Sequence, residues 1–361
     1  MKVLKFGGTS VGSAQRMKEV AKLITDGERK IVVLSAMSGT TNTLVEISDY
    51  LYKKNPEGAN EIINKLESKY RQHIDELFAT PEYKQKGLEL IKSHFDYIRS
   101  YTKDLFTLFE EKVVLAQGEL ISTAMMNYYL QECGVKSVLL PALEYMRTDK
   151  NAEPDPVYIK DKLQIQLELH PDAEIYITQG YICRNAYGEI DNLQRGGSDY
   201  TASLIGAAIN ASEIQIWTDI DGMHNNDPRI VDKTAPVRHL HFEEAAELAY
   251  FGAKILHPTC IQPAKYANIP VRLLNTMDPT APGTLISNDT EKGKIKAVAA
   301  KDNITAIKIK SSRMLLAHGF LRKVFEIFES YQTSIDMICT SEVGVSVSID
   351  NVKHLNEILD D

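Results

Sequence analysis

Short apolar runs alternate with helical stretches at the start of the chain, which is the pattern of a parallel α/β sheet. Residues 1–4 and 30–36 are short and mostly apolar, so both are predicted to form buried strands. Residues 13–24 have apolar positions three and four apart, which predicts a helix. In such sheets ligands bind where strands end, so the loops after both strands are candidate binding loops.

Helical spacing then continues through residues 44–131, with prolines at 56 and 81 marking breaks between helices. We expect a helical insertion in an α/β domain. Strands are predicted next at 137–140, 174–182, 213–217 and 271–275, with 271–275 as the final strand of this domain, and helices at 202–211 and 242–251.

From residue 297 the pattern changes to a small α+β module. A strand is predicted at 303–310, a helix at 319–331, strands at 334–340 and 343–349, and a helix at 352–359. The chain is therefore expected to divide into a domain of residues 1–296 and a smaller domain of residues 297–361.

Composition restricts the functional classes. The 361 residues are 43% hydrophobic, enough for a sizeable core, and the net charge of −8 argues against nucleic acid as a partner. The four cysteines are scattered without a metal-like cluster, which indicates reduced thiols. With no signal peptide and no apolar run of membrane-spanning length, we expect a soluble cytoplasmic protein that does not bind membranes.

The loop after the first strand, KFGGTS, has the composition of a phosphate-binding loop. Glycines let the backbone approach an anion, and the following helix offers free N–H groups at its N-terminus. Gly7 and Gly12 have P-loop spacing, but Ser13 stands where that motif needs lysine, and Lys5 instead precedes the glycines. Taken alone, such a loop is more often an ordinary tight turn.

Several other polar residues have a simple structural explanation beside a functional one. Thr41 or Asn42, after the second strand, could cap the next helix, and Ser198 or Asp199 could cap the helix after a second glycine loop. That explanation does not account for Arg195 beside two glycines. Glu119 lies within a predicted helix, where a lone glutamate is usually solvated.

Seven motifs occur along the chain in the order KFGGTSVGS, VLSAMSGTTN, AQGEL, RGGSDYTA, WTDIDG, DPR and FGAKILHP. In this order and spacing they resemble the aspartate kinases of the amino acid kinase family, and the tail resembles part of an ACT regulatory domain. The resemblance implies an α/β fold, a carbamate kinase-like αβα sandwich. Residues 1–200, with the insertion at 44–131, would be mainly the aspartate-binding lobe, and 201–296 mainly the nucleotide-binding lobe.

The resemblance implies transfer of the ATP γ-phosphoryl group to the side-chain carboxylate of L-aspartate. The product is 4-phospho-L-aspartate, in the first step of lysine, threonine and methionine biosynthesis. By resemblance Lys5 bridges the phosphates, Asp199 organises Lys5 and the metal-bound phosphates, and Gly7 and Gly8 let backbone N–H groups reach them. Mg²⁺ enters with ATP, held by phosphates and water, so neither a metal site in the protein nor a prosthetic group is expected.

The resemblance also assigns the substrate contacts. Arg195 would hold the α-carboxylate of aspartate as a bidentate fork, Glu119 the ammonium group, and Thr41 and Ser198 would add hydrogen bonds. The family's nucleotide positions are matched by Thr218, Asp219, His224, Arg229, Lys254 and Ile255. Two residues depart from the family pattern: His224 stands where relatives often have tyrosine, and Gln194 where glycine is common.

Two other functions remain open. The first is an amino acid kinase that acts on glutamate, acetylglutamate or a nucleotide, although the insertion and the pairing of Glu119 with Arg195 favour aspartate. The second is a non-catalytic sensor that binds an effector. It is disfavoured because such a protein has no chemical need of both Lys5 and Asp199.

The tail gives the last expectation. An ACT module has the order βαββαβ, whereas the chain ends after the second helix. We expect that this form is truncated relative to the natural protein or that its C-terminus is unseen. We also expect that Ile307 and Val347 are exposed on its sheet, and that the open edge favours association with another chain. A homo-oligomer is expected. Inhibition by the effector, lysine or threonine, should be weak, because the family's effector site lies between paired modules.

Overall fold

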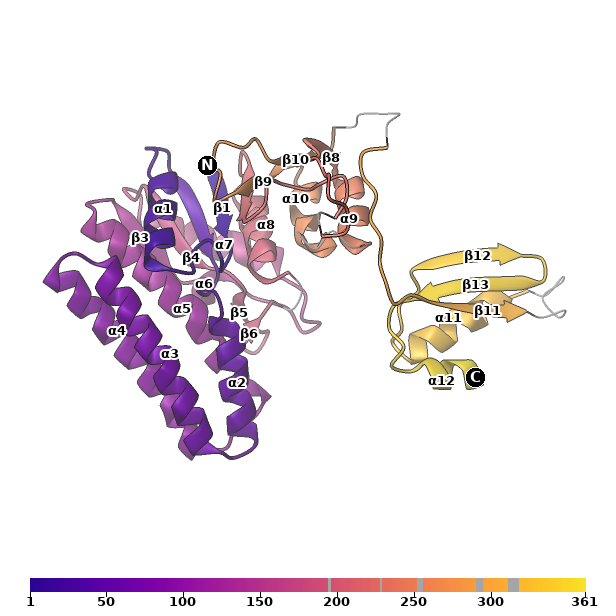
Figure 1. Cartoon of the computed structure of the whole chain (residues 1–361), viewed down its shortest axis with the longest axis horizontal. Coiled ribbons are helices and arrows are strands. Elements are labelled where there is room, and N and C mark those ends of the chain that lie inside the picture. The colour runs from indigo at the N-terminus through magenta and orange to yellow at the C-terminus, as the bar shows by residue number, and fades with distance from the viewer. Residues whose placement is uncertain (194–195, 228, 252–255, 290–294, 311–317) are drawn as a thin grey trace. The chain divides into compact units, whose positions relative to one another are not determined.

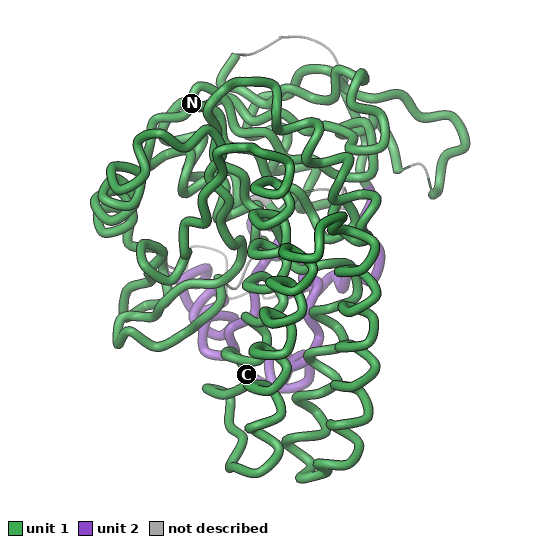
Figure 2. Tube along the Cα trace, turned by 90° about the vertical axis from the view of Figure 1, so that its left-hand side faces the viewer, with its two compact units in different colours: residues 1–299 green, residues 300–361 purple. Residues whose placement is uncertain are grey.

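The computed structural model describes residues 1–361 except 194–195, 228, 252–255, 290–294 and 311–317. The chain forms two compact units, residues 1–299 and 300–361, which Figure 2 distinguishes by colour. Each unit has a hydrophobic core of its own. The division of the first unit into two lobes at residue 200 stays a prediction.

The described part of the first unit is built on an eight-stranded sheet with the order β3-β4-β2-β1-β7-β9-β10-β8. Its pairs are parallel except that β10 runs antiparallel to β9. The strands are β1 (Lys2–Phe6), β2 (Lys30–Leu34), β3 (Ser137–Leu140), β4 (Ile175–Gln179), β7 (Ile214–Thr218), β8 (His239–His241), β9 (Val271–Asn275) and β10 (Thr284–Ser287).

Helices cover both faces of this sheet, as Figure 1 shows. Side chains along β2 point alternately to the two faces of the sheet. Val32 and Leu34 therefore belong to the hydrophobic core on one face, and Ile31 and Val33 to the core on the other. The helices are α1 (Ala14–Ile24), α2 (Thr40–Tyr52), α3 (Pro56–Leu77), α4 (Pro81–Ser100), η1 (Tyr101–Lys103), α5 (Leu108–Glu132), α6 (Ala142–Tyr145), α7 (Pro156–Glu168), α8 (Gly197–Ala208), α9 (Phe242–Tyr250), η2 (Pro258–Ile261) and α10 (Gln262–Tyr266). The result is the predicted αβα sandwich.

The predicted helical stretch at 44–131 is confirmed as α2 to α5. Proline occupies the first turn of α3 and of α4, where its missing N–H needs no partner. Helix α5 begins at a capping box, in which the side chains of Thr107 and Glu110 satisfy orphan N–H groups. Most of α5 is buried, so this helix runs through the core and carries Glu119 into it.

Two predictions about strands were wrong. Residues 174–182 form not one strand but β4 and then β5 (Ile182–Arg184), because Tyr181 has a φ of 69° and turns the chain. Strand β5 pairs with β6 (Ile190–Asn192) in a separate ribbon. Strand β9 is not the last strand of the first unit, since β10 follows it. Strands β8 and β10 have only 3 and 4 residues, too few for a clear periodicity.

The second unit has the predicted βαββα order. Its elements are β11 (Thr305–Lys310), α11 (Phe320–Ser330), β12 (Met337–Ser341), β13 (Gly344–Ile349) and α12 (Leu355–Asp360), and its described strands pair antiparallel in the order β11-β13-β12. The expectation that Ile307 and Val347 are exposed was wrong. They are only 7% and 2% exposed, because both belong to the core that packs with Val324 and Phe328 of α11.

Candidate active site

An ion pair lies at the carboxyl end of the central strand of the sheet. Lys5 is on β1, which pairs with β2 on one side and β7 on the other. Its Nζ atom is 2.6 Å from Oδ1 of Asp199, in the first turn of α8, and the two side chains are only 12% and 15% exposed. Low exposure weakens screening by water, so this lysine presents a positioned positive charge to any anion that binds beside it.

The loops after β1 and β2 touch each other, and glycine makes this possible. The backbone N–H of Ser38 donates to the carbonyl of Gly8 at 3.1 Å. A Cβ atom at Gly8 would lie 2.8 Å from the carbonyl oxygen of Ala36, and one at Gly7 would lie 3.5 Å from Nζ of Lys5. The glycine loop therefore places its backbone directly beside the lysine, as a phosphate-binding loop requires.

A cavity of about 420 Å³ opens beside the ion pair, between the loop after β2, helix α5 and the start of α8. Such a volume suits a small ligand. Its lining consists of Gly8, Ser35, Ala36, Met37, Ser38, Gly39, Thr41, Asn42, Glu119, Tyr181, Gly197 and Ser198.

Helices α2 and α8 both begin at this cavity, and no side chain that the structure describes caps either of them. The N-cap residues are Gly39 and Gly196, with φ of 83° and 73°. The possible capping roles of Thr41 or Asn42, and of Ser198 or Asp199, are therefore wrong, because these residues lie within the first helical turn. Uncapped N–H groups and the positive ends of two helix dipoles make the cavity suitable for anions.

Glu119 is the acidic group of the cavity. It is 4% exposed, and Oε1 accepts a hydrogen bond from the backbone N–H of Ala36 at 3.1 Å. Oε2 is buried and, among the described residues, has no hydrogen-bond partner. Burial raises the pKa of Glu119 to about 7. An unpaired carboxylate oxygen in a cavity is a fitting partner for a ligand's cationic group.

Ser198 fixes the start of α8 against two neighbouring strands. Its Oγ accepts a hydrogen bond from Oγ of Ser35, after β2, at 2.8 Å. It also packs on Gly180, after β4, where a Cβ atom would lie 2.3 Å from Oγ of Ser198. The ends of two adjacent strands, β2 and β4, thus meet at one residue of α8.

The residues predicted to contact the nucleotide follow β7. Thr218 ends this strand and bonds locally to Ile220, Asp219 is exposed, and His224 is hydrogen-bonded to Thr234 at 2.8 Å. Arg229 is exposed and pairs with Asp227 at 2.5 Å. Three predicted site residues, Arg195, Lys254 and Ile255, lie outside the described residues, as does Gln194.

The structure brings together one group of the predicted residues: Lys5, Gly7, Gly8, Thr41, Glu119, Ser198 and Asp199. Ser35 and Tyr181 also line the cavity, although neither was predicted as a site residue. A signal was available for both. Ser35 directly follows the buried strand β2, and Tyr181 follows β4, so each lies at the strand ends where ligands bind in parallel sheets.

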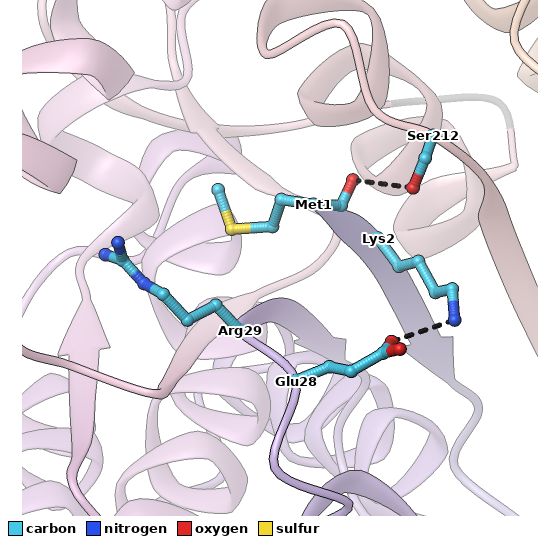
Figure 3. Close-up of a pocket in the computed structure, with 5 residues that line it drawn as sticks. All are labelled: Met1, Lys2, Glu28, Arg29 and Ser212. Carbon is cyan, nitrogen blue, oxygen red and sulfur yellow. Dashed lines mark hydrogen bonds and ion pairs between the residues drawn. The ribbon is translucent and has the colours of Figure 1, made fainter.

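A second cavity, of about 540 Å³, lies at the amino ends of β1 and β2 (Figure 3). Its lysine, Lys2, pairs with Glu28 at 2.9 Å, and Arg29 donates through Nε to the carbonyl of Ala173 at 3.1 Å. Its charges are thus matched within the fold, at the opposite strand ends from Lys5. The first cavity is the candidate active site.

Comparison with known proteins identifies relatives along nearly the whole chain. The model of the amino acid kinase family matches residues 1–275. Lysine-sensitive aspartokinase 3 of Escherichia coli is 35% identical over 96% of this chain and 78% of its own length. Chloroplastic aspartokinase 1 of Arabidopsis thaliana is 38% identical over 97% of this chain, which spans only 63% of that relative.

Solved structures of aspartokinases are also similar to this chain. E. coli aspartokinase III in complex with aspartate and ADP, in the R-state, has a TM-score of 0.83 and 33% identity over 97% of this chain and 79% of that one. The same enzyme with lysine and aspartate, in the T-state, has a TM-score of 0.80 and 33% identity over 100% and 83% of the two chains. Among the described residues, no helix is both long and apolar enough to cross a membrane. On the match to its family model and to these relatives, the chain belongs to the amino acid kinase family.

Proposed function

We propose that this chain catalyses phosphoryl transfer from ATP to the side-chain carboxylate of L-aspartate. One observation carries the proposal: the ion pair of Lys5 and Asp199 lies at the strand ends beside a cavity that holds Oε2 of Glu119, an oxygen without a hydrogen-bond partner among the described residues. The cation suits the phosphates and the carboxylate suits an ammonium group. The solved relative that binds aspartate and ADP supports both assignments.

The groups of the site match the needs of the reaction. The attacking carboxylate of aspartate is ionised at neutral pH, so no general base is required. Negative charge spreads over the moving phosphoryl group, and Lys5 with the N–H groups of Gly7 and Gly8 would stabilise that charge. Asp199 holds the lysine ammonium in place.

Mg²⁺ would enter with the nucleotide and neutralise phosphate charge. It prefers one or two carboxylates together with phosphate oxygens and water. Asp199, the carboxylate beside Lys5, fits that preference, and the described residues contain no group of three or more potential metal-binding side chains.

The cavity would hold aspartate by its charged ends. Glu119 would bind the ammonium group, and Thr41 and Ser198 line the same cavity as hydrogen-bonding residues. Arg195, by resemblance the fork for the α-carboxylate, completes the proposal. Thr218, Asp219, His224, Arg229, Lys254 and Ile255 are proposed for the nucleotide.

An assay of ADP release with and without L-aspartate tests this function. Release should require aspartate and should be weak with glutamate, acetylglutamate and nucleoside monophosphates. Arg195→Ala should weaken aspartate far more than ATP, and Asp219→Ala should do the reverse. Release with another acceptor and none with aspartate would identify a different amino acid kinase, and no release with any acceptor would favour a sensor.

We also propose that an amino acid regulates this protein, which we expect to be a homo-oligomer. The E. coli relative is named lysine-sensitive, so lysine is the first effector to test, with threonine as the alternative. Strong cooperative inhibition of this 361-residue form would contradict the expected weak response.

A further inference from the structure

One turn of helix α3, in the helical insertion, contacts both loops of the candidate active site. Lys69 Nζ donates to the carbonyl of Ser38 at 3.2 Å, in the loop after β2. The next residue, Tyr70, shares a hydrogen bond of 2.8 Å with the Thr40 hydroxyl. These contacts hold the acceptor loop, residues 35–41, from outside the cavity.

The same turn also reaches the glycine loop. His73, one turn after Lys69, has its Nε2 atom 3.4 Å from the carbonyl oxygen of Gly12. Nδ1 of the same ring lies 2.8 Å from the carbonyl oxygen of Lys69. A carbonyl oxygen only accepts, so the bond to Gly12 forms only in the ring form that carries a proton on Nε2. His73 is 9% exposed and its ring lies 6.3 Å from that of Tyr70, so the contact is held within a packed cluster.

The two loops are in contact where α3 meets them. Besides the bond between Ser38 N–H and the Gly8 carbonyl, a Cβ atom at Gly12 would lie 3.0 Å from Cβ of Ser38. One loop would approach the ATP phosphates and the other lines the aspartate cavity. Their relative position therefore sets the distance between phosphoryl donor and acceptor, on which the rate of transfer depends steeply.

We propose that Lys69, Tyr70 and His73 are positioning residues that set the acceptor loop and the glycine loop relative to each other. This proposal rests on the proposed function for its kinetic consequence. The helical insertion then does more than pack on the sheet, because it aligns the two substrates. The three residues have different roles: Lys69 and Tyr70 act on the acceptor side, and His73 acts on the nucleotide side.

Lys69 offers the cleanest test, because it is exposed and its ammonium group can be removed without opening the core. Lys69→Met should raise the KM for aspartate about fivefold, the size of one hydrogen bond, while the KM for ATP changes less than about twofold. Lys65→Met is the matched control, one turn earlier on α3, where the lysine pairs with Glu61. Lys69→Arg should restore the wild-type KM.

His73→Leu should show the opposite preference, with the larger change in the KM for ATP. Amide hydrogen exchange provides a readout that needs no substrate. Exchange should become faster in residues 36–41 of Lys69→Met and in residues 7–12 of His73→Leu, and stay unchanged in Lys65→Met. Thermal unfolding of all variants separates these effects from a general loss of stability.

Unchanged exchange in both loops would overturn the proposal. So would faster exchange without any change in KM, or equal effects of Lys69→Met and Lys65→Met, since a purely structural helix predicts either result. If the wild type does not phosphorylate aspartate, the proposed function fails by itself. Loop exchange in the variants then still decides whether α3 positions the loops.

Discussion

At the scale of single residues, Lys5 is the group on which the proposed chemistry depends. Its ammonium group lies beside Gly7 of the glycine loop, and its partner Asp199 comes from another element. The pair holds the ammonium group in a fixed orientation at low exposure, so no reorganisation is needed when phosphoryl charge develops.

Lys5→Ala is expected to lower kcat by about 10²–10³, the usual loss for one such electrostatic group. Lys2→Ala is the matched control on the same strand, because Lys2 pairs with Glu28 at the far end of β1. Steady-state assays with both substrates saturating measure the effect. Turnover of Lys5→Ala within threefold of Lys2→Ala would exclude the assigned role.

Glu119 makes aspartate binding depend on pH. Its pKa is raised to about 7 in the free site by burial, and an ammonium group beside Oε2 would lower it again. Aspartate should therefore bind about tenfold more tightly per pH unit as the pH rises toward 7, and reach a plateau above it. Calorimetric titrations between pH 5.5 and 8 measure this, with Glu119→Gln expected to bind weakly at every pH.

The raised pKa of Glu119 also predicts that the folded protein loses stability as the pH rises, whereas aspartate binding becomes tighter. The folded pKa lies above the value of 4.5 for an ordinary glutamate, so the folded state binds more protons between pH 4.5 and 7. The free energy of unfolding should therefore decrease as the pH rises from 4.5 to 7, by at most about 3 kcal/mol for a pKa shift of this size. Glu119→Gln should be more stable than wild type above pH 7 in denaturant titrations. Parallel pH profiles of the two proteins would show that Glu119 is not buried as described.

At the scale of elements, the start of α8 is set by the space that Gly180 leaves after β4. A Cβ atom at Gly180 would lie 2.4 Å from Cβ and 2.8 Å from Cα of Ser198, so any side chain must move the helix. Because α8 also carries Asp199, such a movement would separate Asp199 from Lys5.

Gly180→Ala should lower turnover on the order of 10-fold to 100-fold and destabilise the fold by about 1–3 kcal/mol. Gly188→Ala is the control, since its φ of 84° strains an alanine but no described residue lies within 4 Å of the added atom. It should cost about 1 kcal/mol without loss of turnover. Steady-state kinetics and thermal unfolding of both variants test this prediction. Normal turnover of Gly180→Ala would show that the space at Gly180 does not set the position of α8.

At the scale of the whole molecule, the two units have separate cores. Phe328 is 3% exposed in the core of the second unit, whereas Phe325 on the same helix is 44% exposed. This matched pair can show whether the units unfold independently.

Phe328→Ala should destabilise the second unit by about 3–5 kcal/mol, and Phe325→Ala by far less. Scanning calorimetry should then show one transition moved to lower temperature and the other unchanged. If both transitions move together, the units unfold as one and the division has no energetic meaning.

Local sequence patterns predicted many of the helices and strands correctly. Apolar runs such as KIVVL, the helical spacing of α3 and α4, and the βαββα order of the tail are properties of neighbouring residues, so the sequence alone predicts them. The same holds for the glycine loop, because a close backbone approach demands residues without Cβ atoms. The sequence pattern did not predict the short strands β8 and β10, since a strand of 3 or 4 residues is defined by its pairing partner and not by its own pattern.

The site required the tertiary structure. Sequence motifs singled out Lys5, Glu119 and Asp199 as chemical groups, but a lone glutamate in a helix gives no sign of burial. Only the packing of α5 through the core removes Glu119 from water and leaves Oε2 without a partner in the described part of the chain. The order of strands likewise decides which groups meet, because β1 lies between β2 and β7 and thus brings residues distant in sequence to one sheet edge. Periodicity and turn chemistry act over a few residues, whereas strand order and burial arise from the whole chain.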